Sequence, residues 1–201
     1  MRVALIDYGA GNVPSVERAL QKLGAECFRA ASPEQISEAG AIVLPGVGHY
    51  AALIRALDEQ GLRSTLVGAL LGGVPFLGIC LGLQSLYASS EEAMDLAGLG
   101  IFPGRVRSLP PNVKLPHMGW NRLSFAQPSP LFDGLTEADY FYFAHTFAAE
   151  AAGEQVVATC AHGEPFAAVL QRDRVFAVQF HPEKSGQPGS RLLRNFLGFA
   201  A

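Results

Sequence analysis

The sequence predicts an α/β fold, an open, mixed and mainly parallel sheet flanked by helices, of the flavodoxin-like kind. Apolar, β-prone segments alternate with amphipathic helical segments in the first half of the chain. The second half is richer in strands, which indicates that antiparallel strands extend the sheet. We expect one domain over residues 1–201, because this length suits one large core and no repeat or linker interrupts it.

The first half contains the βαβ pattern. Arg2–Ile6 is an apolar strand, and residues 7–12 (DYGAGN) form a turn in which Asn12 is placed to cap the next helix. Pro14 lies in the first turn of that helix, and Gly24 ends it. The further elements expected here are a strand at 41–44, a loop at 45–48, a helix at 50–60, a strand at 75–79 and a helix at 81–89.

The second half is read as a series of short strands followed by one helix. Residues 109–117 contain three prolines and read as a loop rather than a domain linker. The expected strands are 104–109, 120–125, 140–143, 156–160, 166–170 and 175–180, and the final helix runs from about residue 190 to residue 199. In such sheets the site lies beyond the carboxyl ends of the parallel strands.

Charge and hydropathy exclude several classes of function. The net charge is −3 and no run of Lys and Arg offers a footprint for nucleic acid. Residues 64–90 carry no charge and are long enough to span a bilayer, but residues 72–75 (GGVP) break any helix there, so we expect no membrane span. The first residues lack the pattern of a signal peptide.

The three cysteines, Cys27, Cys80 and Cys160, do not form a disulfide framework. This usage fits a reducing compartment, so we expect a cytoplasmic protein. No paired Cys or His spacing indicates a zinc site, and neither a metal nor another cofactor is expected.

Cys80 is the candidate nucleophile. Residues 78–82 (GICLG) follow a buried strand and open a helix, which is the layout of a nucleophile elbow with glycine on both sides. A thiol at a helix N-terminus is stabilised as thiolate by the helix dipole. The alternative is an inert, buried cysteine, which is the usual fate of this residue.

His181 is the candidate base, with Glu183 to orient it. A strand runs directly into His181-Pro182-Glu183, and Pro182 favours an extended conformation for the residue before it. Residues two apart in an extended segment point the same way, so the carboxylate can stabilise the imidazolium. The alternatives are a solvated loop histidine and a surface carboxylate.

The loop at residues 45–48 (PGVG) is the candidate oxyanion hole. Its small residues, Gly46, Val47 and Gly48, free backbone N–H groups to face a substrate, and the N–H of Leu81 is the second candidate donor. An ordinary glycine turn is the alternative.

The remaining histidines and cysteines lack a partner motif. We expect structural roles for His49, His117, His145 and His162, and core positions for Cys27 and Cys160.

Three segments together resemble the class I (triad) glutamine amidotransferases. They are residues 45–48 (PGVG), 78–84 (GICLGLQ) and 179–183 (QFHPE), in the order and spacing of that family. The resemblance covers essentially the whole chain. It implies the mixed open sheet and a glutamyl thioester on Cys80.

Four more segments resemble the glutaminase subunits of imidazole glycerol phosphate synthases: residues 7–12, 116–121 (PHMGWN), 142–147 (YFAHTF) and 181–185 (HPEKS). That resemblance implies glutamine as substrate and a heterodimer with a separate (β/α)8-barrel cyclase. The cyclase uses the ammonia to make imidazole glycerol phosphate and an aminoimidazole carboxamide ribotide in histidine biosynthesis.

The same resemblance implies roles for residues outside the triad. Substrate contacts are implied for Gln84 and Glu92 and for the backbone near Thr146 and Phe147. The carboxylate of Glu92 suits the α-ammonium group of glutamine, and the amide of Gln84 can serve its α-carboxylate. The implied cyclase interface consists of Asn12, Met118, Trp120, Tyr142 and Lys184, although Trp120 also suits a core aromatic. The chain departs from the family where Thr146-Phe147 replaces the usual Ser-Tyr and Leu83 replaces a common Met.

Three other readings remain open at this point. A glutaminase feeding pyridoxal phosphate synthase usually has a Gly-Gly-Glu-Ser loop and Cys-Ala-Gly at its elbow, unlike this chain. A free-standing cysteine hydrolase does not account for the segments around Trp120 and Lys184. The third alternative is a non-enzymatic member that uses the fold only to bind a partner. The presence of Cys80, His181 and Glu183 argues against it, because such a protein does not need these residues.

Overall fold

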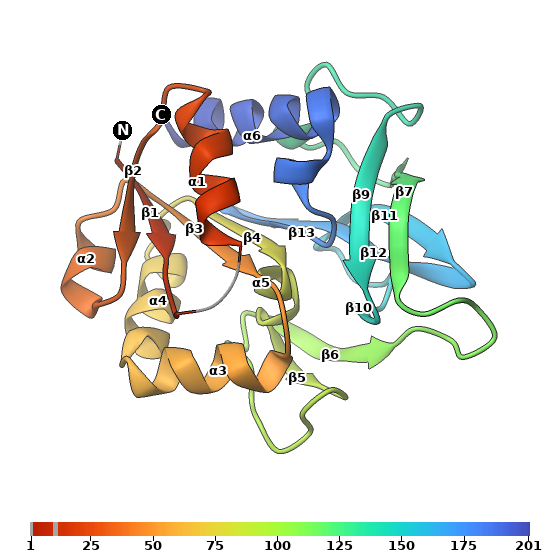
Figure 1. The fold of residues 1–201 in the computed structure, drawn as a ribbon, viewed down its shortest axis with the longest axis horizontal. Coiled ribbons are helices and arrows are strands. Elements are labelled where there is room, and N and C mark those ends of the chain that lie inside the picture. Colours follow the sequence, from red (N-terminus) through yellow and green to blue (C-terminus); the bar gives the residue numbers. More distant parts are fainter. Residues whose placement is uncertain (1, 10–11) are drawn as a thin grey trace.

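The computed structural model describes residues 2–9 and 12–201. Its main feature is an eight-stranded sheet with the order β2-β1-β3-β4-β13-β12-β11-β8 (Figure 1). The strands are β1 (Arg2–Ile6), β2 (Glu26–Ala30), β3 (Ala41–Gly46), β4 (Phe76–Cys80), β5 (Tyr87–Ser90), β6 (Phe102–Ser108), β7 (His117–Arg122), β8 (Ser124–Phe125), β9 (Tyr140–His145), β10 (Phe147–Ala149), β11 (Val156–His162), β12 (Glu164–Arg172) and β13 (Val175–Val178). The helices are α1 (Val13–Gln21), α2 (Pro33–Ser37), α3 (Tyr50–Glu59), α4 (Leu62–Leu71), α5 (Leu81–Gln84) and α6 (Gly186–Ala200), with 3₁₀ turns at Pro130–Phe132 and Pro182–Lys184.

The sheet is mixed and mainly parallel. Strands β2, β1, β3, β4 and β13 pair in parallel, and β12, β11 and β8 continue the sheet in antiparallel fashion. The carboxyl ends of β3, β4 and β13 therefore lie side by side at one edge. The predicted fold class is confirmed.

Alternation along the strands divides the core between the two faces of the sheet. On β1, Val3 and Leu5 belong to one cluster, whereas Ala4 and Ile6 belong to the other. Helices α1 and α6 cover the first face, and α3 and α4 cover the second (Figure 1). Both faces are sealed from water, which explains why the central strands read as continuous apolar runs.

Two smaller sheets lie beside the main one. One has the order β10-β6-β5, and the other is the antiparallel pair β7-β9. The single strand expected at 120–125 is wrong: β7 ends at Arg122 and pairs with β9, while β8 joins the main sheet. Buried Leu123 lies between them, where the chain passes from one sheet to the other.

The helix expected at 81–89 is also wrong, because α5 ends at Gln84. The Ser85 hydroxyl donates to the carbonyl of Gly82 at 2.9 Å, and residues 87–90 then pair with β6 as strand β5. The polar edge strand β2 and the five-residue helix α2 are elements that the apolar pattern does not predict.

Asn12 occupies the cap position of α1 as expected, but its side chain makes no capping hydrogen bond. Residues 10 and 11 of the expected turn lie outside the described residues. Among residues 2–9 and 12–201, no helix has both the length and the apolar character needed to cross a membrane.

Candidate active site

Cys80 stands at the sharp turn between β4 and α5. Its backbone has φ 54° and ψ −104°, a conformation that L-residues adopt only under strain. A Cβ on Gly78 would lie 2.8 Å from the carbonyl oxygen of Gly82, and a Cβ on Gly82 would overlap the carbonyl oxygen of Leu44. The two glycines therefore let the strand and the helix approach closely enough to form the elbow.

The candidate oxyanion segment is packed directly on this elbow. Pro45 and Gly46 are the last residues of β3 and pair with Ile79 and Cys80, so the expected loop is shorter than residues 45–48. A Cβ on Gly46 would lie 2.5 Å from the Cβ of Leu81. Gly46 thus allows the contact that brings Val47 and Gly48 next to the nucleophile.

The hydroxyl of Tyr8 is buried beside this segment. Burial raises the pKa of Tyr8 to about 12, and the adjacent backbone N–H of Val47 partly opposes that rise. Among the described residues, the Tyr8 hydroxyl has no hydrogen-bond partner.

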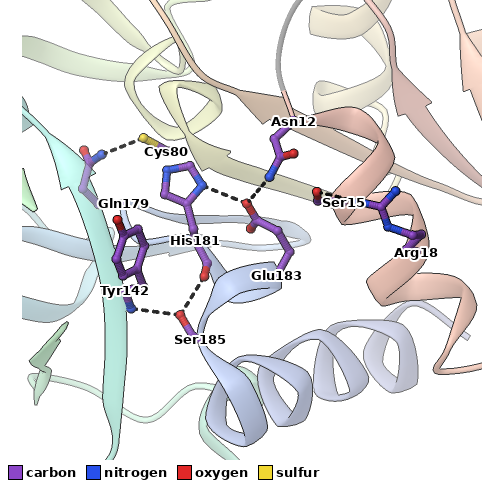
Figure 2. A network of polar contacts seen from close by, with 9 residues as sticks. All are labelled: Asn12, Ser15, Arg18, Cys80, Tyr142, Gln179, His181, Glu183 and Ser185. Carbon is purple, nitrogen blue, oxygen red and sulfur yellow. Dashed lines mark hydrogen bonds and ion pairs between the residues drawn. The ribbon is translucent and has the colours of Figure 1, made fainter. Parts of the chain in front are cut away.

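His181 and Glu183 form a buried pair behind the thiol. His181 Nδ1 lies 2.9 Å from Glu183 Oε1, and the Cys80 sulfur lies beside the imidazole ring (Figure 2). Burial alone would lower the pKa of His181, but the neighbouring Cys80 and Glu183 raise it to about 10. The pKa of Glu183 is lowered despite burial, because His181 and the Asn12 amide stabilise the carboxylate. The geometry thus favours the imidazolium form of His181 between Cys80 and Glu183.

A hydroxyl braces the catalytic loop against β9. The Tyr142 N–H donates to Ser185 Oγ at 3.0 Å, and Ser185 Oγ donates to the His181 carbonyl at 2.6 Å (Figure 2). The His181 N–H donates in turn to the Tyr142 carbonyl at 2.8 Å. The histidine backbone is therefore fixed on both sides.

One cavity of about 360 Å³ brings most of the expected residues together. It is lined by Cys80, His181, Val47, Gly48, Leu81, Gln84, Glu92, Thr146, Phe147 and Lys184, together with Pro116, Ala144 and His145. Glu183 contacts the imidazole of His181 on the side away from Cys80. Gly46 packs against Leu81 and Gly82 of the elbow.

The two expected substrate side chains are held differently. Glu92 Oε2 accepts the Tyr50 N–H at 2.9 Å, at the start of α3. Gln84 Nε2 donates to the Phe147 carbonyl at 2.7 Å and to Gln179 Oε1 at 3.2 Å. Its two N–H groups are thus engaged and its oxygen is left for a ligand, which suits a donor such as an α-ammonium better than the α-carboxylate expected from sequence.

Gln179 is a polar residue of the site to which the sequence reasoning assigned no role. It is fully buried, and its Nε2 lies 3.5 Å from Cys80 Sγ (Figure 2). The alternation that pairs His181 with Glu183 extends one step back to Gln179, so the sequence contained the signal. The other thiols are less reactive, because burial raises the pKa of Cys27 to about 11 and that of Cys160 to about 12.

His145 and His117 are buried next to the cavity. His117 Nδ1 lies 3.0 Å from His145 Nε2, and His145 Nδ1 lies 3.0 Å from the Phe147 carbonyl. Burial, together with a neighbouring imidazole, lowers the pKa of His117 to about 4 and that of His145 to about 3. Both histidines are therefore neutral at physiological pH and structural in character, as the sequence predicts.

Four of the five expected interface residues gather at the outer side of β7 and β9. Trp120 pairs with Tyr142 across the strands, with ring centroids 5.9 Å apart, and Lys184 Nζ lies 5.8 Å from the Tyr142 ring centroid. Met118 is 65% exposed and Trp120 is 54% exposed, so the core reading of Trp120 is wrong. Asn12 differs, because its amide donates to Glu183 Oε1 at 3.0 Å.

Comparisons with known proteins agree with this geometry. The chain matches the family described as glutamine amidotransferase class-I over residues 4–198. It is 46% identical over 195 residues to imidazole glycerol phosphate synthase subunit HisH of Methanothermobacter thermautotrophicus, with 97% of each chain covered. It is 40% identical over 196 residues to the protein of that name from Bacillus cereus, with 98% of this chain and 94% of that protein covered.

A solved structure described as a glutamine amidotransferase superposes with a TM-score of 0.79. The match covers 98% of both chains at 22% sequence identity, and so it establishes likeness of fold alone.

The neutral state of His145 predicts an acid-sensitive contribution to stability. Its folded pKa of about 3 lies below the ordinary value of 6.5, so the unfolded chain binds the proton first as the pH falls. This contribution to stability is complete above pH 6.5 and is lost as the pH falls toward 3.

The variant His145→Asn tests this. Its side-chain amide can replace the Nδ1 donor, but it does not titrate. We expect the plot of unfolding free energy against pH to be shallower by about 1.4 kcal/mol per pH unit between pH 6 and 4. Urea unfolding at several pH values checks this, and equal slopes contradict it.

Proposed function

The chain belongs to the class-I glutamine amidotransferase family, and from this premise we propose that it is the glutaminase subunit of an imidazole glycerol phosphate synthase. It hydrolyses glutamine to glutamate and ammonia. The observation that carries the proposal is one cavity in which a cysteine elbow, the imidazole of a buried His–Glu pair and the backbone of Val47 and Gly48 after β3 meet.

The geometry supports a two-step acyl transfer. The Cys80 thiolate attacks the carbonyl carbon of the glutamine side-chain amide, and the negative charge that develops on the oxygen is stabilised by the backbone N–H groups of Val47 and Leu81. His181 protonates the departing ammonia, which leaves a glutamyl thioester. A water molecule, deprotonated by His181, then hydrolyses the thioester to glutamate and regenerates the thiol. Glu183 keeps the imidazole oriented throughout.

Glutamine is oriented by the polar wall of the cavity. The Glu92 carboxylate and the Gln84 side-chain oxygen are the two acceptors available to an α-ammonium group. The backbone around Thr146 and Phe147 lines the same cavity and is assigned to the rest of the amino-acid moiety.

The exposed surface around Trp120 supports a protein partner. Exposed aromatic and Met side chains beside an active-site opening are typical of an interface. We assign Met118, Trp120, Tyr142 and Lys184 to contact with a (β/α)8-barrel cyclase, and Lys184 to a carboxylate beside the ammonia exit. Asn12 contacts the catalytic carboxylate instead, because its amide donates to Glu183 Oε1. The cyclase joins the ammonia to its phosphoribulosyl substrate, giving imidazole glycerol phosphate and the aminoimidazole carboxamide ribotide.

We further propose one glutamine amidotransferase domain over residues 1–201 and a cytoplasmic location. The three free cysteines support a reducing compartment. The reaction above needs no metal or organic cofactor.

Replacing the nucleophile separates ammonia production from ammonia use. Cys80→Ser is expected to lower glutamine-dependent synthesis by roughly 10⁴-fold or more, since a serine here is far less nucleophilic. The same complex with the cyclase should still form imidazole glycerol phosphate from added ammonium. Both rates are measured by product formation. The assignment of Cys80 as nucleophile is contradicted if Cys80→Ser keeps its glutamine-dependent activity. It is also contradicted if an assembled complex loses its ammonium-dependent activity.

The oxyanion segment is proposed to be the regulated part of the site. In this proposal the Val47 N–H points away from the substrate at rest, and it turns toward the substrate oxygen when the cyclase holds its ligand. Gly48 has φ 97° and no atom within 4 Å of a built Cβ, so alanine there acts through backbone strain alone. The alternative is a preformed oxyanion hole with control exerted elsewhere.

Gly48→Ala is accordingly expected to lower the ligand-stimulated glutaminase rate by roughly a hundredfold. Alkylation of Cys80 should be nearly unchanged, because the thiol itself is untouched. Gly61→Ala is the matched control, since Gly61 also has positive φ and open space but lies between α3 and α4. Full stimulation in Gly48→Ala would show that the segment does not switch.

The exposed position of Trp120 predicts a binding defect without a folding defect. Trp120→Ala is expected to weaken association with the cyclase by roughly 30-fold or more, since large aromatics at interface centres contribute about 2 kcal/mol or more. The isolated subunit should melt at an unchanged temperature. Leu71→Ala is the control, because Leu71 is 72% exposed on α4. Titration calorimetry measures the affinity. An unchanged affinity, or unfolding of the free variant, would remove Trp120 from the interface.

A further inference from the structure

A thiolate at Cys80 would gain little stabilisation from helix α5. Helix α5 has only four residues, so its dipole is much weaker than that of the helix expected from sequence. Gln179, the residue after β13, places its side-chain Nε2 3.5 Å from the sulfur. Gln179 is fully buried, so its amide is aimed at the sulfur without competition from water.

The polarity of the Gln179 amide is fixed by its neighbours. The Phe147 carbonyl can only accept, so Gln84 must turn its NH₂ group toward it. The second hydrogen of that NH₂ group is donated to Gln179 Oε1 at 3.2 Å. Gln179 must then present its own NH₂ group to Cys80. Rotating the Gln84 amide by half a turn would place its oxygen against the Phe147 carbonyl oxygen, and rotating the Gln179 amide would place two NH₂ groups against each other.

The Phe147 carbonyl is itself held from the other side. It accepts from His145 Nδ1, and this fixes His145 Nε2 as an acceptor for His117 Nδ1. His117 Nε2 then accepts from the amide of Asn121, which also donates to the carbonyl of Ala161. Donors from both directions therefore converge on one carbonyl oxygen.

We propose that Gln179 stabilises the Cys80 thiolate by donating an amide hydrogen to the sulfur, with the direction of that hydrogen bond imposed by the Phe147 carbonyl through Gln84. A hydrogen bond to a charged acceptor is stronger than one to a neutral group, so the donor favours thiolate over thiol. Gln84 thereby serves both the substrate and the nucleophile. The inference rests on the proposed function only in taking Cys80 as the nucleophile.

The test measures the thiolate directly in the free subunit, without glutamine or the cyclase. The rate of Cys80 alkylation by iodoacetamide is recorded against pH, and Cys80→Ser supplies the background from Cys27 and Cys160. The midpoint of this profile belongs to the Cys80–His181 pair, and the variants leave His181 and Tyr8 in place. Failure of the glutaminase assignment would appear in the Cys80→Ser synthesis assay, whereas failure of this inference appears only in the alkylation midpoint.

Two variants separate hydrogen-bond polarity from packing. Gln179→Met keeps the length of the side chain and removes the donor, and the midpoint is expected to rise by about 1 pH unit, a tenfold slower reaction below it. Gln84→Glu offers Gln179 an acceptor, so Gln179 turns and presents its oxygen to the sulfur. A rise at least as large is expected there, although Gln179 itself is intact.

Gln171→Met is the matched control, since Gln171 lies in β12 of the same sheet, away from the cavity. Its midpoint should equal that of the unmodified protein. An unmoved midpoint in folded Gln179→Met overturns the inference, as does an equal shift in Gln171→Met. Should Gln179→Met fail to fold, Gln84→Glu decides alone, and an unmoved midpoint in that variant overturns the inference.

Discussion

The close approach of β3 to the turn between β4 and α5 is the constraint on which the rest of the site depends. Cys80 is held at φ 54°, a strain of order 1–3 kcal/mol that the pairing of β4 with β3 and β13 offsets. The contact requires a bare backbone at Gly46 and Gly82. Once it is made, the Cys80 side chain reaches the cavity that Val47 and Leu81 also line.

Two of the buried polar groups around this elbow are oriented by acceptors that cannot donate. The Glu183 carboxylate fixes one nitrogen of His181, and the Phe147 carbonyl fixes the amide of Gln84. A low-dielectric interior makes each such orientation costly to reverse, so the site is preorganised before glutamine arrives. The segment that this network does not hold is the one at Val47 and Gly48, which accounts for assigning control to it.

Strand β9 connects the surface to the site through the alternation of its side chains. Tyr142 faces outward toward Trp120, whereas His145 faces inward toward the cavity. The Tyr142 backbone also holds His181 directly and through Ser185. A partner that binds the outer side therefore presses on an element already hydrogen-bonded to the catalytic histidine, which is a physical route for coupling between binding and catalysis.

The sequence by itself determined the fold class, the elbow and the His181–Glu183 pair, because strand periodicity and local turn chemistry fix these within a few residues. Only the tertiary structure decided the early end of α5, the exposure of Trp120 and the hydrogen-bond partners of Asn12 and Gln179. Each depends on contacts between segments far apart in the chain, such as β5 with β6 or Gln84 with Phe147. The local sequence does not specify which distant acceptor a buried side-chain amide binds. The direction of the hydrogen bonds at the Cys80 thiol is therefore known only from the packed structure.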